Sequence, residues 1–569
     1  MRRRTLAGFA GFAGLLAGLA CVAGCAGARP RAAQVTTDFA RAEQTITAEE
    51  LAGVVRFLAD DALEGRAPGT RGDRLARAYV ASVFGLLGLE PGGPNGSFEQ
   101  PFDLVGVTTK APSRWTFRGR GGEATLRRHR AFVVSVGGGA KRVDLDDAEV
   151  VFVGYGIQAP EHDWDDFKGA DLRGKVLLFL NDDPDWDPDL FAGKRRLYYG
   201  RWTYKFESAA RQGAAGAIVI HTTESASYPW QTVQTSWEGE NSRLPSSTTP
   251  RPALEGWVTE DAARRIAALG GRDLEALRAS ARERTFRPVP LGVRTSVRLD
   301  SEQRRYATAN VLALLPGRDP ERRDEVIVYT AHHDHLGTAK GPDGKTVVYN
   351  GALDNASGVA QLLAIARAST ALPEPPERSM LFLAVGAEEQ GLLGSEYWAS
   401  RPTVPPGRLI ANINFDGANI WGRTRDVALV GAGKSTLDAW VEKAAARQDR
   451  TVGDDPFPER GSFYRSDQLN FARIGVPALF FGRGIDFVGR PAGWGRTEME
   501  RWVAEHYHQP SDDFDPATWD FTGMVDDARL GFAIGLALAE SDARPEWLPS
   551  DEFREVRARS LAASSDGAP

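Results

Sequence analysis

The sequence predicts an α/β protein whose main domain is a doubly wound, mostly parallel sheet with a β-rich domain inserted into it. The 569 residues are 42% apolar, which is enough for more than one core. Beyond about residue 305, short apolar runs alternate with segments of helical period, a pattern that predicts parallel strands covered by helices on both faces. From about 100 to 295, short β-rich runs prevail. The expected strands of the main domain are 326–331, 379–385, 409–416 and 477–481, and its helices are 356–369, 391–399, 435–447 and 524–539.

The amino terminus has the three parts of an export signal. Three arginines precede an apolar run over residues 6–23, and small residues follow. Residues 22–25, Val-Ala-Gly-Cys, resemble the site where bacterial lipoproteins are cleaved and acylated, which favours a signal peptide over 1–24 and a lipid on Cys25. The alternative is an uncleaved helical anchor, because about 18 apolar residues is near the minimum that spans a bilayer. Either way we expect an exported protein that works outside the cytoplasm, and the favoured lipoprotein would be held in the cell envelope by the lipid on Cys25.

The rest of the chain divides by composition and period. Residues 25–44 are small and polar, which predicts a tether. Thr47 and Glu50 form a capping-box pattern before a helical stretch through Leu58, and a second helical run covers 73–87. The predicted plan is a first part of the main domain at 45–110, the inserted domain at 111–298, the second part of the main domain at 299–545 and a carboxyl-terminal tail at 546–569.

Composition excludes several classes of function. The 69 basic and 76 acidic residues are interspersed, so the chain lacks the electrostatic footprint of a nucleic-acid-binding protein. Both cysteines, Cys21 and Cys25, precede the folded part, which therefore has neither a disulfide framework nor a thiolate metal site. Any metal must be held by histidines and carboxylates.

Five residues of metal-ligating type occur where the alternating pattern ends its strands: His332, Asp354, Glu389, Asp416 and His508. Each alone is a common turn or cap residue. Together they predict a site, because a doubly wound sheet brings the carboxyl ends of its parallel strands to one edge. A ligand set of nitrogen and oxygen suits zinc or another borderline divalent ion.

The motifs around these residues carry a resemblance to a known family. They are Tyr-Thr-Ala-His332-His-Asp334-His-Leu-Gly, Gly-Ala-Leu-Asp354-Asn355-Ala-Ser-Gly, Ala-Glu388-Glu389-Gln-Gly-Leu-Leu-Gly-Ser, Asn-Phe-Asp416-Gly and Tyr-His508-Gln-Pro-Ser-Asp. In this order they resemble the co-catalytic di-zinc aminopeptidases, a family that also includes glutamate carboxypeptidases. The resemblance covers residues 45–110 and 300–545.

The resemblance implies two zinc ions per chain. It places His332 and Asp416 on one ion, Glu389 and His508 on the other, and Asp354 between the two. Water between the ions then ionises near neutral pH and attacks the peptide bond.

The resemblance also implies roles for neighbouring residues. Glu388 would be the general base, and Asp334 would accept the second imidazole N–H of His332 and fix its tautomer. Glu388 and Glu389 can differ in role only if the backbone turns between them. A cis peptide is expected between Asp354 and Asn355.

The inserted domain at 111–298 is similar to the protease-associated insert of many members. The residues that carry this weaker likeness are Val-Phe-Val-Gly-Tyr155-Gly-Ile, Trp164-Asp-Asp-Phe-Lys-Gly and Lys205-Phe-Glu-Ser-Ala-Ala-Arg-Gln-Gly-Ala-Ala-Gly-Ala-Ile-Val-Ile.

Several other residues have more than one interpretation. His333 and His335 are expected to be neighbours of the metals rather than ligands, since the ligand set is complete without them. Tyr464, Asp467 and Trp494 are candidates for the substrate pocket, the alternative being loop packing. The run 431–436, Gly-Ala-Gly-Lys-Ser-Thr, lacks the first glycine of a phosphate-binding loop and is interpreted as an ordinary turn.

The leading functional prediction is a zinc exopeptidase that removes amino-terminal residues from peptides or proteins. A carboxypeptidase or dipeptidase on the same scaffold is the nearest alternative. It would need a cation for the substrate carboxylate, and Arg465, Arg483 and Arg490 lie in the right region. A receptor-like binding protein on an inactive scaffold, which would typically lose metal ligands, and a single-metal glutaminyl cyclase are more distant alternatives.

Overall fold

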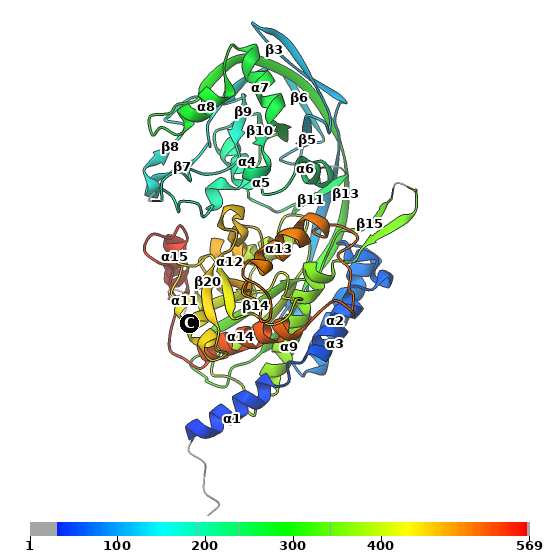
Figure 1. The fold of residues 1–569 in the computed structure, drawn as a ribbon, viewed down its shortest axis with the longest axis vertical. Coiled ribbons are helices and arrows are strands. Elements are labelled where there is room, and N and C mark those ends of the chain that lie inside the picture. Colours follow the sequence, from blue (N-terminus) through cyan, green and yellow to red (C-terminus); the bar gives the residue numbers. More distant parts are fainter. Residues whose placement is uncertain (1–30, 189, 238, 342, 566–569) are drawn as a thin grey trace, which may run out of the picture.

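The computed structural model describes residues 31–188, 190–237, 239–341 and 343–565. It has two lobes joined by one long strand (Figure 1). The predicted signal peptide and the acylation site at Cys25 lie outside the described residues. Within the described part, none of the helices has both the length and the apolar composition that crossing a bilayer requires.

The lower lobe is built on a mixed sheet with a parallel centre. Four parallel strands lie in the order β17, β14, β18, β21, flanked by antiparallel β13 beside β17 and antiparallel β19 beside β21, with β20 at the outer edge. The bounds are β14 Val326–His332, β17 Ser379–Val385, β18 Leu409–Asn414, β19 Asp426–Val430, β20 Thr451–Asp454 and β21 Ala478–Arg483. The parallel centre explains why these strands are continuous apolar runs, since both of their faces are buried.

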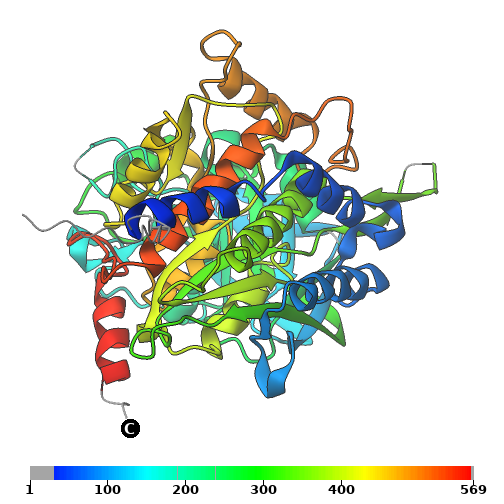
Figure 2. The same cartoon turned by 90° about the horizontal axis from the view of Figure 1, so that it is seen from below.

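Helices cover both faces of this sheet. Along β14, Ile327 and Tyr329 belong to the core under one helical layer, whereas Val326 and Val328 pack on the opposite side with Trp398 and Phe471. The first layer contains α2 Ala48–Leu58, α3 Arg71–Leu86, α9 Ser357–Thr370, α11 Asp438–Ala446 and α14 Thr522–Ala539, and the second contains α10 Leu393–Ser400 and α12 Gln468–Arg473. Figure 2 shows the first layer from below. The predicted doubly wound α/β fold is confirmed, with element ends within a few residues of those expected.

The upper lobe contains most of the predicted inserted domain, residues 111–298, which we call the insert segment. Its strands are β3 Arg114–Gly119, β4 Gly122–Arg127, β5 Phe132–Val136, β6 Arg142–Phe152, β9 Val176–Leu180, β10 Gly216–His221, β11 Glu240–Arg243 and β12 Leu254–Thr259, and its helices are α4 Trp202–Arg211, α5 Thr223–Ala226, α6 Trp230–Ser236, α7 Glu260–Leu269 and α8 Leu274–Ala281. Parallel β9, β10 and β12 form its centre.

One strand, β13 Val289–Leu315, passes through both lobes (Figure 1). It pairs with β3 and β6 of the insert segment and then with β17 of the lower lobe. Antiparallel β2, Glu99–Lys110, accompanies it from Asp300 to Val311. The predicted boundary at 298/299 therefore falls inside a hydrogen-bonded ribbon rather than in a linker.

Two terminal segments are more ordered than expected. The predicted tether contains a helix, α1 Arg31–Glu43, and Phe39 on it stacks on Phe532 of α14 with ring centroids 5.5 Å apart. The tail contains α15, Arg554–Ser565, and buries Trp547 and Phe553. In both places apolar side chains bury against the lower lobe.

The remaining regular elements are short, apart from α13. They are β1 Glu90–Pro91, β7 Gln158–Ala159, β8 Trp164–Asp165, the hairpin of β15 Gly337–Lys340 with β16 Thr346–Tyr349, and α13 Trp494–Glu505.

Candidate active site

The carboxyl ends of the parallel strands deliver three of the predicted ligands to one edge of the sheet. His332 is the last residue of β14, Glu389 lies in the loop after β17, and Asp416 follows the end of β18. Asp354 lies in the loop before α9, and His508 lies just after α13. The structure brings all five together.

The five side chains form two groups that share Asp354. His332 Nε2 lies 3.2 Å from Asp354 Oδ1 and 3.4 Å from Asp416 Oδ1. His508 Nε2 lies 3.4 Å from Asp354 Oδ2 and 3.1 Å from Glu389 Oε2. Ligands held tetrahedrally around zinc at ~2.0–2.1 Å are about 3.3 Å from one another. The four distances match that spacing, so the residues fit two metal ions bridged by Asp354.

The hydrogen bonds of His332 leave the correct nitrogen free for a metal. Its Nδ1 lies 3.2 Å from the backbone oxygen of Asp334, whereas its buried Nε2 has no hydrogen-bond partner among the described residues. Donation from Nδ1 fixes the tautomer and directs the Nε2 lone pair to the site. The expectation that the Asp334 carboxylate does this needs correction, since Asp334 Oδ1 is 3.9 Å from Nδ1.

The Asp334 carboxylate instead holds the loop that carries Glu388 and Glu389. It accepts the backbone N–H groups of Glu388 at 3.0 Å and Glu389 at 3.3 Å. Ala387 has a φ of 57°, so the chain turns sharply just before the two glutamates. This turn, together with the two hydrogen bonds, lets the two side chains take different positions.

Asp512 does the same for the loop that carries Asp354. Its carboxylate accepts the backbone N–H groups of Leu353 at 2.8 Å and Asp354 at 3.0 Å. The peptide between Asp354 and Asn355 is cis, as the family resemblance implied. Asn355 Oδ1 accepts the N–H groups of Gly358 and Gly417, which ties this loop to the one after Asp416.

His335 and His333 are both fully buried beside the site. His335 Nδ1 is 2.7 Å from Glu389 Oε1, and with Asp354 these two residues form a further group that could hold a metal ion. His333 Nε2 lies 3.1 Å from the backbone oxygen of Ala309, away from the metal groups. His335 therefore contacts a predicted ligand, and His333 belongs to the packing under the site.

The electrostatics of the site favour bound cations. Burial would raise the pKa of Asp354 and Glu389, but the facing imidazoles hold the pKa of Asp354 well below its usual range and that of Glu389 at about 2. Burial lowers the pKa of both His332 and His508, but nearby carboxylates more than offset this effect. Glu388 chiefly raises the pKa of His332 and Glu389 chiefly raises that of His508, so that both pKa values lie well above the ordinary value for histidine. The carboxylates thus create a field that protons or metal ions must neutralise.

Glu388 differs from the ligands. Burial raises its pKa well above the ordinary value, and the neighbouring Asp416 and Glu389 raise it further. It belongs to neither metal group. A carboxylate that lies beside the ligands and prefers its protonated form is suited to accept a proton from water.

The three predicted pocket residues have different positions. Asp467 is fully buried, accepts a hydrogen bond from Ser395 and has a pKa raised by burial to about 7. Tyr464 is also buried, but its hydroxyl donates to Glu552 of the carboxyl-terminal segment at 2.6 Å, so it packs between loops instead of facing substrate. Trp494 packs against Phe487 at a ring distance of 5.1 Å.

A cavity of about 120 Å³ opens beside the metal ligand Asp416. Its apolar lining comes from four segments of the chain: Trp421, Ala428 and Val430; Phe457; Phe480 and Phe481; and Met499, Trp502 and Val503. We call it the Asp416 pocket. The residues of α13 that line it are Met499, Trp502 and Val503, not the predicted Trp494, because Trp494 occupies the opposite end of that helix.

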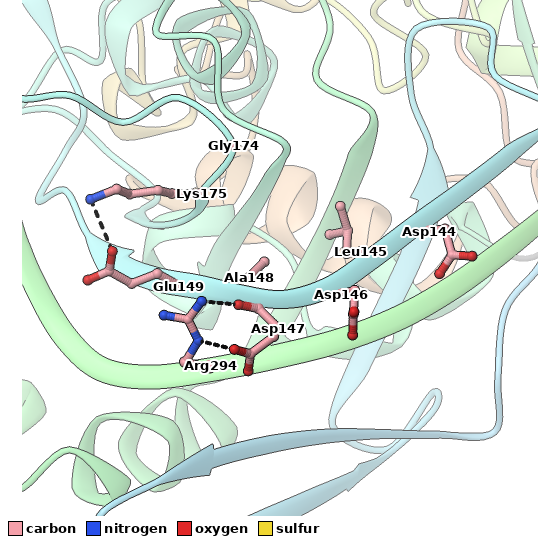
Figure 3. A pocket seen from close by; sticks show the side chains of 9 residues that line it. All are labelled: Asp144, Leu145, Asp146, Asp147, Ala148, Glu149, Gly174, Lys175 and Arg294. Atoms are coloured by element: carbon pink, nitrogen blue, oxygen red, sulfur yellow. Dashed lines mark hydrogen bonds and ion pairs between the residues drawn. The ribbon is translucent and has the colours of Figure 1, made fainter.

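A second hollow, of about 440 Å³, lies on the insert segment between β6 and β13 (Figure 3). Its charged side chains pair with one another: Arg294 with Asp147 at 2.7 Å, and Lys175 with Glu149 at 3.0 Å. None of its residues belongs to a metal-type group among the described residues. The chemistry of the chain is thus concentrated in the lower lobe.

Comparison with known sequences identifies the part of the chain that holds this site. Residues 310–533 match the profile of Peptidase family M28. This region is a peptidase family M28 domain. The M28 domain contains all five predicted ligands and Glu388.

The chain is also similar to a curated relative and to solved structures. The chain is 25% identical to Aminopeptidase YwaD of Bacillus subtilis (strain 168) over 199 residues, which is 34% of this chain and 36% of that protein. An aminopeptidase structure from Aneurinibacillus sp. strain AM-1 matches 87% of this chain and 95% of its own, with 20% identity and a TM-score of 0.51, and shows the same fold. The structure of BSAP, a zinc aminopeptidase from Bacillus subtilis, matches 86% of this chain and 94% of its own, with 18% identity and a TM-score of 0.42.

Sequence reasoning missed two residues that build the M28 site. Asp512 stands four residues after His508 in the quoted motif, but nothing in the spacing indicates that it accepts backbone N–H groups. Arg66 is fully buried and donates to the backbone oxygens of His333, Asn350 and Gly351, which joins the amino-terminal part to both ligand loops. A lone arginine in a loop gives no signal of such a role.

Proposed function

We propose that this protein is a di-zinc aminopeptidase that removes the first residue of peptides. The observation that carries the proposal is the geometry of two ligand groups sharing Asp354, with the unligated Glu388 beside them. The similar proteins described above are aminopeptidases, which supports cleavage at the amino-terminal end of the substrate. The assembly of a full ligand set argues against a receptor-like protein on an inactive scaffold.

The zinc ions, when bound, would lower the pKa of water toward ~7 and polarise the substrate carbonyl. Glu388 takes the proton of the attacking water and delivers it to the leaving amine. Its raised pKa suits the second half of that task, because the proton it gains is held until the amine accepts it. Asp334 keeps Glu388 in position through the backbone hydrogen bond at 3.0 Å.

The Asp416 pocket provides a place for the first side chain of the substrate, directly beside a metal ligand. The substrate amine then lies near the acidic ligands. A carboxypeptidase would instead use an arginine to hold the terminal carboxylate, and Arg483 lines the same pocket. This observation keeps the carboxypeptidase as the second candidate.

The test compares peptides of one sequence with a free and an acetylated amino terminus, with and without a chelator. We expect cleavage of the free peptide alone, abolished by the chelator and restored by zinc. Glu388→Gln should keep two zinc ions yet lose about 10²- to 10⁴-fold in kcat. Equal cleavage of both peptides would contradict an aminopeptidase, and normal turnover by Glu388→Gln would remove it from the role of base.

We also propose that the mature chain begins at Cys25 and is lipid-anchored on the outer side of a membrane. The support is the run 22–25 after an apolar segment. Expression with labelled palmitate should label the wild type and not Cys25→Ser. Labelling of both, or of neither, would contradict the anchor.

A further inference from the structure

We propose that the Asp416 pocket selects substrates whose first side chain carries a carboxylate, so that the enzyme prefers an amino-terminal glutamate or aspartate. The inference rests on the proposed aminopeptidase function and deepens it. It starts from two arginines, Arg460 and Arg483, which line a largely apolar pocket together with Asp416 and Asp455.

Arg483 lies at the end of the pocket next to the metal ligand. A side chain on Gly417, the residue after Asp416, would meet its guanidinium at 3.3 Å. The guanidinium has one long hydrogen bond, at 3.3 Å, to the backbone oxygen of Ala418, and it lies 5.9 Å from the Trp421 ring centroid. Within the described residues it forms no ion pair at 4 Å or less.

Arg460 enters the pocket from the loop that follows β20. Its guanidinium lies over the Phe457 ring, 3.8 Å from the centroid, and forms no ion pair with a described residue either. Burial lowers the pKa of both Arg460 and Arg483. In Arg483 the charges of Asp416, Asp354 and Asp527 oppose this effect, and the charge of Arg460 adds to it. Two guanidinium groups that share a pocket and repel each other are stabilised by an anion placed between them.

Two buried arginines elsewhere in the described residues have such an anion from the protein itself, whereas buried Arg66 donates to backbone oxygens instead. Arg378 pairs with Glu325 at 2.6 Å, and Arg450 pairs with Asp527 at 2.8 Å. The two carboxylates that line the pocket, Asp416 and Asp455, have other partners. Asp416 belongs to a metal group, and Asp455 accepts the backbone N–H of Phe457 at 2.8 Å.

Bound zinc would add positive charge beside the Asp416 pocket. Two Zn²⁺ ions carry four positive charges, and the ligand carboxylates Asp354, Glu389 and Asp416 carry three negative ones. With the metals bound, the ligand set therefore supplies no net negative charge to Arg483. The missing anion is left to the substrate, and the apolar walls suit the methylene groups of a glutamate side chain.

The experiment measures kcat/KM for the free-amine peptides Glu-Ala-Ala-Ala, Gln-Ala-Ala-Ala and Leu-Ala-Ala-Ala. Glutamate and glutamine have nearly the same shape, so their ratio isolates the charge. We expect the wild type to favour the Glu peptide over the Gln peptide by about 10- to 100-fold, the range given by one or two charge-assisted hydrogen bonds. Arg483→Gln and Arg460→Gln should each reduce this ratio while cleaving the Leu peptide.

Two further variants keep the test independent of folding losses. Arg460→Glu should gain activity on Lys-Ala-Ala-Ala relative to the Glu peptide, an inversion that an unfolded protein cannot give. The control is Arg501→Gln, an exposed arginine on α13 that pairs with Glu498 and Glu505 outside the pocket. It should leave every ratio unchanged.

The outcomes separate this inference from the proposed function. A wild type that cleaves the Leu and Gln peptides at least as well as the Glu peptide overturns the inference and leaves the aminopeptidase intact. Cleavage of none of the free-amine peptides in the presence of zinc overturns the aminopeptidase itself. Cleavage of acetyl-Ala-Ala-Glu that is lost in Arg483→Gln would mean that the pocket holds a terminal carboxylate, and this result overturns both.

Discussion

Replacing Asp334 by asparagine tests how the fold builds the metal centre. The carboxylate accepts two consecutive backbone N–H groups, from Glu388 and Glu389. Asparagine has the same shape but one acceptor oxygen, so one buried N–H group faces an amide N–H₂ instead. Leaving a buried donor unsatisfied costs about 1–3 kcal/mol. The displaced loop carries the ligand Glu389, and loss of a partner that orients ligands typically weakens metal binding by about 10- to 100-fold, or about 1.4–2.8 kcal/mol.

The effect should depend on zinc. Burial raises the pKa of Asp334 to about 7 in the metal-free protein. At pH 6 the metal-free carboxyl is therefore mostly protonated and already resembles asparagine. Bound cations favour the ionised form, so the substitution should destabilise the zinc-bound state more than the metal-free state.

The assay is zinc affinity by chelator competition, together with urea unfolding of metal-free and zinc-bound protein at pH 6. Asp426→Asn is a matched control, because Asp426 accepts the consecutive N–H groups of Ile485 and Asp486 at 3.0 and 2.9 Å away from the ligands. The control should lose stability equally in both states and keep its zinc affinity. If Asp334→Asn behaves like the control, the carboxylate does not hold the metal loop and the reasoning is refuted.

Three further predictions concern the surroundings of the site. His335→Phe removes the group 2.7 Å from Glu389 and should weaken zinc binding by about tenfold or more, measured by the same competition; unchanged affinity would contradict an orienting role. Burial lowers the pKa of His333 to about 3, below the ~6.5 of a histidine in the unfolded chain, so the contribution of the neutral imidazole to stability is complete above pH 6.5 and is lost as the pH falls. Between pH 7 and pH 5, the unfolding free energy of the metal-free wild type, measured in urea, should therefore fall by about 2 kcal/mol more than that of His333→Gln. Equal losses in the two proteins would refute this prediction. Trp547→Ala removes a buried side chain whose Nε1 donates to the backbone oxygen of Gly475. The substitution should lower the unfolding free energy by about 3–5 kcal/mol. A loss below about 1 kcal/mol would mean that the tail is not part of the core.

The central sheet could be predicted from the sequence because its strands are buried on both faces. Val326–His332 and Ser379–Val385 are uninterrupted apolar runs that end in turn signals, and local pattern alone defines them. The long β13 strand could not be predicted in the same way. Between residues 301 and 306 its side chains are largely exposed or half-buried, and pairing of its backbone with β2 keeps the strand continuous there. Pairing with a segment about 200 residues away leaves no local periodicity.

The ligands could be predicted because their residue types carry the chemistry, whereas the supporting residues act through their positions. Asp512 is an ordinary loop aspartate until the fold places it under the backbone of Leu353 and Asp354. Tyr464 shows the converse case, in which the alternative of loop packing fits the structure. Its sequence neighbourhood suggested a substrate contact, but its hydroxyl meets Glu552, 88 residues later, in a segment that the sequence indicated to be a tail.

The two lobes contribute different parts of the active site. Every predicted metal ligand comes from the lower lobe, at the edge of its sheet. The loop that carries Phe457 and Arg460, however, contacts the insert segment. There the backbone N–H of Arg196 donates to the backbone oxygen of Pro458 at 3.1 Å, and Leu197 packs with Phe463. The sheet therefore determines where the metals bind, and the insert segment holds one wall of the pocket beside them. Because that wall carries Arg460, sequence changes in the insert segment can alter which first residue the enzyme accepts without disturbing the metal centre.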